Sequence, residues 1–534
     1  MMTAMRMLYI IMCTAALPCA GAMAADEGTV SANAGNADTI KAAAPAAILE
    51  RIDAHADRMR SIGSGVWANP AMRPFEQSYS YTTVGLEYRR ERQDKAVSTQ
   101  AGDGYDGAGF AAATYIRHGN ATLWGEGGYT TGRHRSPVWN EVADAELLYP
   151  YLTADDTGGD ISSETYRFAG GYAARNERLT WGASLGYTAG QHYRDVDPRP
   201  RNVTGRLEAA AGIGWSPAGR YVFAVGGEAM KYKQTSDIDF KSELGRATIY
   251  HLTGLGTDYV RFRGNGMTTH YDGTRYAVRL DMTPECGNGM LATLRVARLT
   301  VKTILNDMNK LPMASLWHNT LDAAMGYRHD NGHGTAWGVA ADMNIYRRHG
   351  SENIFGDAAS AIYPQIGTVE MFADNGYTVA ARGVAEHDFG GVRLSYEPAA
   401  GYSHVCRIYL DPPREWLVNS LSVSQRLTAA AMLGRRWHAA LEVAWTMNSP
   451  TESHFVTEEF FGIESQGGNE RLMEALRSDF TFASSVSRSY SAAVSVSRAL
   501  NDGYALRLSA GFSHDGYASS THGNAVSIGA AVIF

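Results

Sequence analysis

Polar and apolar side chains alternate along most of this chain. From Ser80 onward, units of about 10 to 15 residues with this alternation are each followed by a turn. In the clearest unit, Leu179 to Gly190, Leu, Trp, Ala and Tyr occupy one face, and Thr, Gly and Ser occupy the other. Successive side chains of a strand point to opposite faces, so each unit indicates a strand with one apolar face. Trp437 to Met447 and Tyr504 to Ser513 repeat the pattern. It predicts an all-β fold.

Charged side chains indicate which face meets which environment, because they nearly always fall on the polar face. An Arg placed outward at the midplane of a bilayer would cost roughly 2–4 kcal/mol. We therefore expect a transmembrane antiparallel β-barrel whose apolar face contacts lipid. The residues expected to line its lumen are Glu126, Arg167, Arg206, Glu208, Glu228, Arg279, Asp322, Arg328, Asp342, Arg382, Arg393, Glu442 and Arg507. They either line a solute path or pair with one another to brace the interior.

One stretch departs from this rule. Between Leu291 and Thr303, Arg295 and Arg298 fall on opposite faces of the predicted strand. We expect a bulge there, or a displaced strand end.

Short and long connections alternate along the chain. Short turns include 117–120, 284–289 and 329–334, and long loops include 133–160, 234–269, 350–374 and 449–484. Outer-membrane barrels have short periplasmic turns and long extracellular loops, which places both termini in the periplasm and makes the strand number even. We count about 18 strands, or 14 to 16 if some segments are divided too finely. A soluble propeller is disfavoured, because no blade-sized repeat of roughly 40–45 residues is visible.

The last residues predict the strand that closes the barrel. Val526, Ile528, Val532 and Phe534 share one face of this stretch, and small residues occupy most of the other face. It resembles the closing strand of bacterial outer-membrane barrels, which typically ends in Phe and is read by the barrel-insertion machinery. This resemblance implies that machinery and outer-membrane lipid as partners.

The N-terminus predicts a secretory signal over residues 1–24. Arg6 is followed by the apolar stretch Leu8 to Leu17 and by the small-residue pattern Ala22-Met23-Ala24. No later apolar run is long enough for a transmembrane helix. Cleavage would leave Cys286 and Cys406, which the strand pattern puts at opposite ends of the barrel, so we expect no disulfide.

Residues 25–78 are expected to form a periplasmic or hatch segment before the barrel domain, residues 79–534. Asp26 to Ala44 has a disordered composition, and Pro45 to Arg60 has the apolar stripe of an amphipathic helix. The stretch Trp67-Ala68-Asn69-Pro70-Ala71 resembles the Asn-Pro-Ala element before the first strand of fatty-acid-transporter-like barrels. Trp67, Asn69 and Pro70 are therefore the hatch candidates. An Asn-Pro turn without function is the alternative.

The sequence offers little sign of catalysis, metal binding or nucleic-acid binding. The net charge of -7 gives no support to nucleic-acid binding. Most of the 16 histidines stand alone, and the nearest pair, His329 and His333, lacks further ligands. Ser513, His514 and Asp515 are adjacent on a strand and cannot converge as a triad. We expect no cofactor and no enzyme.

By pattern, by the Trp-x-Asn-Pro-Ala element and by the terminal Phe, the chain most resembles a Bacteroidota outer-membrane barrel family known only as a domain of unknown function. That family supplies no solute and no functional residue. A polar lumen of this size implies porin-like passage of small solutes through the outer membrane of a Gram-negative bacterium. The alternatives are hatch-gated uptake of hydrophobic ligands, a structural or secretion-associated barrel and, last, a lipid hydrolase.

Overall fold

The computed structural model describes residues 47–242, 246–264, 268–358, 362–457, 470–517 and 520–534. The expected signal and the stretch with a disordered composition lie outside these residues. Every element named below belongs to one compact unit, Ala46–Phe534.

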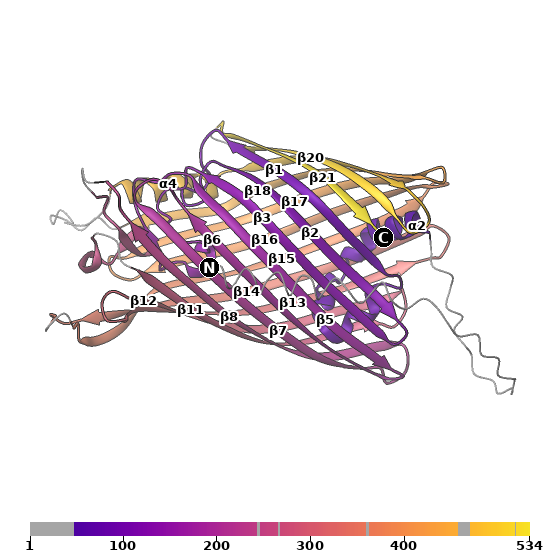
Figure 1. Ribbon diagram of the computed structural model, residues 1–534, viewed down its shortest axis with the longest axis horizontal. Coiled ribbons are helices and arrows are strands. Elements are labelled where there is room, and N and C mark those ends of the chain that lie inside the picture. Colours follow the sequence, from indigo (N-terminus) through magenta and orange to yellow (C-terminus); the bar gives the residue numbers. More distant parts are fainter. Residues whose placement is uncertain (1–46, 243–245, 265–267, 359–361, 458–469, 518–519) are drawn as a thin grey trace, which may run out of the picture. The chain divides into compact units, whose positions relative to one another are not determined.

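Within the described residues, 18 strands form one antiparallel sheet that closes on itself (Figure 1). Each strand pairs with its neighbour along the chain, and β1 pairs with β21. The predicted fold class and strand number are confirmed. The strands are β1 (Tyr81–Gln93), β2 (Gly104–His118), β3 (Ala121–Arg135), β5 (Ile161–Asn176), β6 (Leu179–Tyr193), β7 (Arg199–Trp215), β8 (Tyr221–Asp239), β11 (Thr269–Pro284), β12 (Gly289–Leu305), β13 (Leu311–Asp330), β14 (Thr335–Phe355), β15 (Gln365–Asp388), β16 (Val392–Tyr409), β17 (Arg414–Leu433), β18 (Trp437–Thr457), β19 (Ser487–Ala499), β20 (Ala505–Tyr517) and β21 (His522–Ile533).

The two faces of the barrel wall differ as the alternation predicts. On β6, Leu185 is 60% exposed and Trp181 is 53% exposed, whereas Thr180 is buried. The same outward apolar positions recur on β20 and β21, where Leu508 and Ile528 are exposed. A continuous exposed apolar surface suits lipid rather than water, and the closed sheet leaves no unpaired strand edge in the bilayer. The barrel is therefore a transmembrane one.

The bulge expected within 291–303 is absent. The register of β12 with β11 is continuous there, and its only shift against β13 falls between Thr303 and Ile304. Arg298 lies on the outer face, and its guanidinium is 5.7 Å from the centre of the Trp317 ring. Beyond Arg298, outward positions of β12 carry Thr300 and Lys302. The strand thus continues past the apolar belt, where an outward cation meets no lipid.

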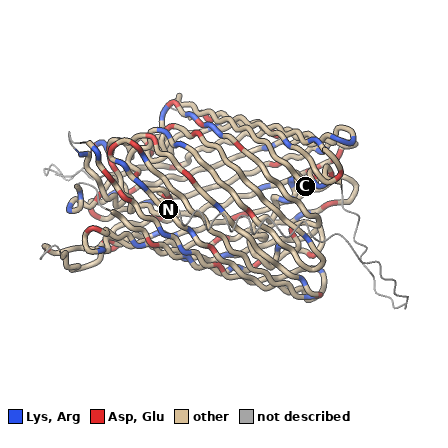
Figure 2. Tube along the Cα trace, in the orientation of Figure 1, with Lys and Arg blue, Asp and Glu red and all other residues tan. Residues whose placement is uncertain are grey.

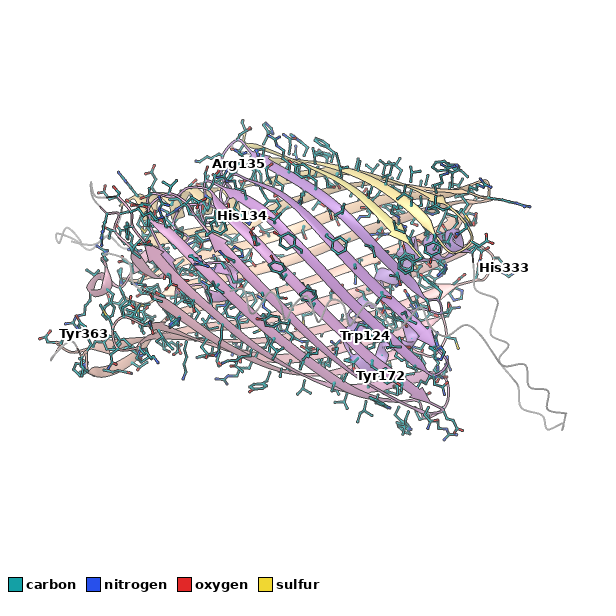
Figure 3. All side chains as sticks on the ribbon, viewed as in Figure 1. Trp124, His134, Arg135, Tyr172, His333 and Tyr363 are labelled. Atoms are coloured by element: carbon teal, nitrogen blue, oxygen red, sulfur yellow. The ribbon has the colours of Figure 1, made fainter. Side chains whose placement is uncertain are left out.

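The two ends of the barrel are unlike. The turn end carries short turns such as 285–288 and 331–334, and the loop end carries the longer connections. Figure 1 shows helix α4 (Glu470–Ala483) at the loop end and helix α2 (Ile48–Ala56) at the turn end, with the C-terminus. In Figure 3, Tyr363 marks the loop end and His333 marks the turn end. Charged residues gather at the loop end (Figure 2).

The loop end contains its own small elements. A short sheet joins β4 (Thr153–Ala154), β9 (Tyr250–Gly254) and β10 (Thr257–Asp258), and helix α3 (Ala145–Leu148) precedes it. A further short helix is η4 (Val260–Phe262). The loop predicted over 350–374 is mostly strand, since β14 runs to Phe355 and β15 begins at Gln365. Both strands extend past the apolar belt, where alternation in polarity fades.

The N-terminal segment, residues 48–80, begins with α2 inside the range predicted for a helix. It continues as η1 (Arg58–Ser61), η2 (Ser64–Ala68) and η3 (Pro70–Phe75). The first two residues of the predicted helix, Pro45–Arg60, lie outside the described residues. The observed helix ends before Arg60, because the Asp57 side chain accepts a hydrogen bond from the Met59 amide and starts a new turn. Of the helices in the described residues, none is long and apolar enough to cross a membrane.

Candidate functional site

The N-terminal segment lies against the inner wall at the turn end. Helix α2 packs on β17, β18 and β19, η1 on β14 and β15, η2 on β11 and β12, and η3 on β3 and β5 to β8. After η3 the chain returns to the start of the barrel, where the Tyr115 hydroxyl donates to the Arg73 carbonyl at 2.6 Å. The segment therefore follows most of the circumference and narrows the lumen there.

Glycines in the wall make room for the predicted Asn-Pro-Ala element. The fully buried Asn69 amide donates to Asp281 at 2.8 Å, and its side-chain oxygen accepts from the Ala71 amide at 3.1 Å. A Cβ on Gly182 would lie 2.5 Å from the Pro70 carbonyl oxygen, and one on Gly212 would lie 2.0 Å from the Asn69 side-chain oxygen. Any other residue at Gly182 would collide with backbone. We call Gly182, Gly212 and Gly226 the glycine cradle.

Each hatch candidate is buried in this arrangement. Trp67 is 8% exposed, and Asn69 and Pro70 lie between the cradle and the rest of the segment. Ile62 packs in the same cluster as Trp67, and a Cβ on Gly326 would lie 2.9 Å from it. The second half of the segment is thus fitted to the wall by shape.

Ion pairs hold the first half. Arg58 pairs with Glu397 and lies 3.5 Å from Glu442, and its backbone amide donates to Glu386 at 3.0 Å. Asp53 pairs with Arg393 and lies 3.3 Å from His438. The partners belong to β15, β16 and β18, so charges of the lumen wall fasten α2 and η1 in place.

One side chain joins the two halves across the turn end. Arg60, on η1, donates to the Tyr79 hydroxyl at 2.7 Å and lies 3.5 Å from Glu76. Glu76 and Tyr79 follow η3. All three residues line a cavity of about 450 Å³ at the turn end.

Most of the predicted lumen-lining residues are paired. The pairs among described residues are Glu126–Arg167 (3.3 Å), Arg206–Asp144 (3.7 Å), Glu208–Arg275 (3.0 Å), Glu228–Arg279 (3.4 Å), Glu228–Arg295 (2.8 Å), Asp322–Arg295 (3.1 Å), Asp342–Arg382 (3.4 Å), Arg393–Asp53 and Glu442–Arg426 (3.0 Å). Arg328 donates to the Gly287 carbonyl at 2.7 Å, and Arg507 donates to the Ser497 hydroxyl at 3.1 Å. This arrangement fits the bracing role better than an open ring of charge.

At the loop end, the loop between β3 and β5 folds into the barrel. Arg194, which follows β6, is buried against this loop. It pairs with two carboxylates of the loop, Glu141 at 2.5 Å and Asp155 at 2.8 Å. Trp139, Leu148 and other apolar side chains of the loop pack against Tyr232 and Tyr271 of the wall. These two ion pairs join Arg194 to the loop in the interior of the barrel.

Helix α4 covers another part of the loop end. Asp479 accepts hydrogen bonds from the Thr99 amide and hydroxyl, both at 2.9 Å. Burial raises the pKa of Asp479 to about 6, against the lowering effect of these hydrogen bonds and of Lys95. The Phe480 ring packs edge-on against the Trp416 ring, with 5.0 Å between the ring centres. The helix is therefore docked by one carboxyl group and an aromatic contact.

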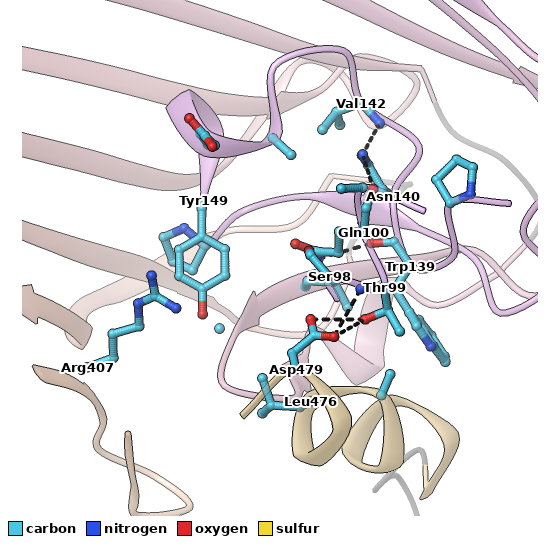
Figure 4. A pocket seen from close by; sticks show the side chains of 18 of the residues that line it. Ser98, Thr99, Gln100, Trp139, Asn140, Val142, Tyr149, Arg407, Leu476 and Asp479 are labelled. Carbon is cyan, nitrogen blue, oxygen red and sulfur yellow. Dashed lines mark hydrogen bonds between the residues drawn. The ribbon is translucent and has the colours of Figure 1, made fainter. Parts of the chain in front are cut away.

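Between these loops and the wall lies a cavity of about 1250 Å³, which we call the loop-end cavity. Figure 4 shows Tyr149 and Arg407 on one side of it and Trp139, Thr99 and Asp479 on the other. Six wall residues on adjacent strands β12 to β17 stand opposite one another in register and all line it. This cavity row is Leu299, His318, Arg348, Asp374, Arg407 and Trp416.

Contacts within the cavity row are specific. Arg407 donates to Asp374 at 3.3 Å, and Asp374 also accepts from the Tyr346 hydroxyl at 3.0 Å. Arg348 donates to His318 at 3.3 Å and to the Tyr149 carbonyl at 3.2 Å. The three charged residues of the row, Arg348, Asp374 and Arg407, alternate in sign, and Tyr149 of the inward loop packs against Arg407.

The sequence did not single out this row. Asp374 falls at the end of a predicted loop, and Arg348 lies between the polar residues Arg347 and His349, where the alternation in polarity is lost. The adjacent arginines Arg347 and Arg348 carried the available signal, because strand alternation turns one of them inward.

The described residues contain no group of three or more His, Cys, Asp or Glu side chains placed to hold a metal. His333, at the turn end, is hydrogen-bonded to the Asn331 carbonyl at 2.7 Å. Cys286 and Cys406 are both free thiols.

No curated protein matches the chain. Solved structures similar to it include the ferric enterobactin receptor PfeA from Pseudomonas aeruginosa (9% identity, 85% of this chain and 80% of that one, TM-score 0.36). Others are BauA, the ferric preacinetobactin receptor from Acinetobacter baumannii (8%, 85% and 80%, TM-score 0.39), and the CymD monoaromatic hydrocarbon channel (11%, 88% and 92%, TM-score 0.29). None of these likenesses assigns a role to a residue here. The model of a family of unknown function, DUF6850, matches residues 70–534, and the chain belongs to that family.

Proposed function

We propose that this protein is a channel of the Gram-negative outer membrane through which a small solute passes along the barrel lumen. In this proposal the turn end and both termini face the periplasm, and the loop end faces the outside. The closed sheet with an apolar outer face supports the location, because such barrels are the transmembrane form of the outer membrane.

The observation that carries the proposal is the N-terminal segment inside the turn end. A lumen with a loop-end cavity of about 1250 Å³ has room for a solute, and the segment narrows its exit. A freely open porin would need no such segment. Restricted passage through a partly filled lumen therefore fits the geometry better than open diffusion, and fits hatch-gated uptake as well.

A structural barrel without transport is the second candidate. The fit of Asn69 and Pro70 to the glycine cradle favours it, because close packing of the segment against the wall opposes its release from the lumen. The ionic half, with Asp53 and Arg58, favours a hatch, because partly exposed ion pairs can be replaced by contacts with water.

The two candidates differ in solute flux. The full-length mature protein and a variant lacking residues 25–72 would be reconstituted in liposomes, and swelling in uncharged sugars of graded size would be followed. Restricted passage predicts slow entry of the smallest sugars in the full-length protein, and faster entry with a larger size limit in the deletion variant.

Refolded barrel content would be matched by heat-modifiability in gels, so that the deletion is compared at equal amounts of inserted protein. Fast entry into both kinds of liposome would contradict the restriction. No entry into either kind would contradict the channel and favour the structural role.

A further inference from the structure

The charged residues of the cavity row differ in whether they contact a group of opposite charge. Asp374 is engaged by Arg407 and by Tyr346, and only 6% of its side chain is exposed. Arg348 donates only to neutral groups, namely His318 and backbone carbonyls, and has no carboxylate oxygen within 4.0 Å among the described residues. This cluster of two guanidinium groups and one carboxylate therefore holds one positive charge in excess.

An apolar surface adjoins this excess charge. The guanidinium of Arg407 is 5.2 Å from the centre of the Tyr149 ring and 5.7 Å from that of Trp416, and 32% of its side chain is exposed. Leu472 and Leu476 of α4 line the same cavity, and so does Leu255. A bound molecule would thus meet cationic groups and an aromatic and aliphatic wall together.

We propose that the loop-end cavity binds a singly charged amphipathic acid, and that such acids are the solute class of the channel, an inference that rests on the function proposed above. The acid group contacts Arg348 and the exposed part of Arg407. The aromatic or aliphatic body lies against Tyr149, Trp416 and α4.

The remaining carboxylates of the cavity limit the charge of the ligand. Glu146 and Asp479 also line it, whereas Asp144 is already paired with Arg206, so a polyanion would meet two further carboxyl groups outside the cavity row. A neutral ligand would cover Arg348 without supplying a counter-charge, which is costly in a site partly shielded from water. The volume exceeds what an inorganic ion needs and suits a molecule with a ring or a short chain.

The test uses the full-length mature protein in detergent and 4-phenylbutyrate as the probe, with 4-phenylbutyramide as its uncharged match. Binding is followed by calorimetry and by tryptophan fluorescence, because Trp139 and Trp416 line the cavity. We expect the acid to bind and the amide to bind much more weakly. Arg348→Gln should raise the dissociation constant of the acid by about tenfold or more, because a charge-assisted hydrogen bond is lost.

Arg347→Gln is the matched control. Arg347 is the neighbouring residue on β14, lies on the outer face and is exposed, so its loss should leave binding unchanged. Asp374→Asn offers a change in the other direction, since it frees Arg407 and should tighten binding of the acid severalfold. This second variant keeps the test decisive if Arg348→Gln fails to fold.

Equal binding of acid and amide would overturn the inference. So would equal losses in Arg347→Gln and Arg348→Gln, or absence of binding by the native protein. Sugar flux without acid binding would remove this ligand class and leave the channel intact. Acid binding without flux in any liposome would leave the cavity assignment in place and contradict the channel.

Discussion

Neighbouring side chains of this wall have opposite environments. On β14, Arg347 faces outward and Arg348 reaches the loop-end cavity. On β6, Leu185 is exposed to the lipid side, and Ser184 faces inward between the small residues Gly171 and Ala210 of the adjacent strands. The period of two residues decides which chemistry each side chain meets.

The facing of β6 gives a direct prediction. Leu185→Arg should insert poorly, because an outward Arg near the midplane costs roughly 2–4 kcal/mol, whereas Ser184→Arg should insert normally. The amount of heat-modifiable protein in the membrane fraction measures both variants. Equal amounts would show that the faces of this strand are assigned wrongly.

At the scale of elements, the sequence predicted what local pattern determines. It predicted the strands and the helix within Pro45–Arg60, and it singled out the Asn-Pro-Ala element, whose role as a hatch stays a prediction. It could not predict the glycine cradle, because Gly182 and Gly212 lie more than 100 residues from Asn69 and look like ordinary small lumen residues. The sequence could not predict the cavity row for a related reason: its residues are brought together only by strand register and by an inward loop.

Docking of α4 should depend on pH through Asp479. Burial raises the pKa of this carboxyl group to about 6, above its value in an undocked helix. Docking is therefore strongest when the group is protonated, at pH below about 4, and weakens as pH rises through 6.

Asp479→Asn should remove this dependence, because Asn accepts the bond from Thr99 without a charge. Tryptic cleavage of α4, which contains Arg471 and Arg477, would be compared between native protein and variant at each pH, so that the pH response of trypsin cancels. The native helix should be cut faster than the variant at pH 8, and the ratio of the two rates should fall as the pH is lowered to 5. A constant ratio of rates across this range would refute the prediction.

At the scale of the whole molecule, the barrel depends on one seam. β1 and β21 meet along their length, and beyond β21 the Phe534 amide and carbonyl exchange hydrogen bonds with Thr82 at 2.9 and 2.8 Å. The Phe534 ring lies 5.7 Å from that of Tyr504. Closure of the sheet was predictable from the terminal strand. Of the predicted resemblance, the family match confirms that the chain belongs to a family of unknown function.

Phe534→Asp should lower the amount of assembled barrel, because it places a charge at the apolar end of the seam. Phe534→Trp keeps an aromatic ring there and should assemble as the native chain does. Pulse-labelled cells would show the fraction that becomes heat-modifiable with time. Normal assembly of the Asp variant would remove the role proposed for this residue in closure and in recognition by the insertion machinery.

The central claim is that the docked N-terminal segment restricts the lumen, and single-channel conductance in planar bilayers tests it most directly. Gly182→Val drives a side chain into the Pro70 backbone, whereas Gly186→Val, on the same strand and face, meets only ordinary contacts at 3.5 Å or more. Faster tryptic cleavage after Arg58 or Arg60 would report release of the segment. The account predicts low conductance in the native protein and in Gly186→Val, and a severalfold larger conductance in Gly182→Val. Conductance of Gly182→Val equal to that of the native protein, with the segment released, would contradict it.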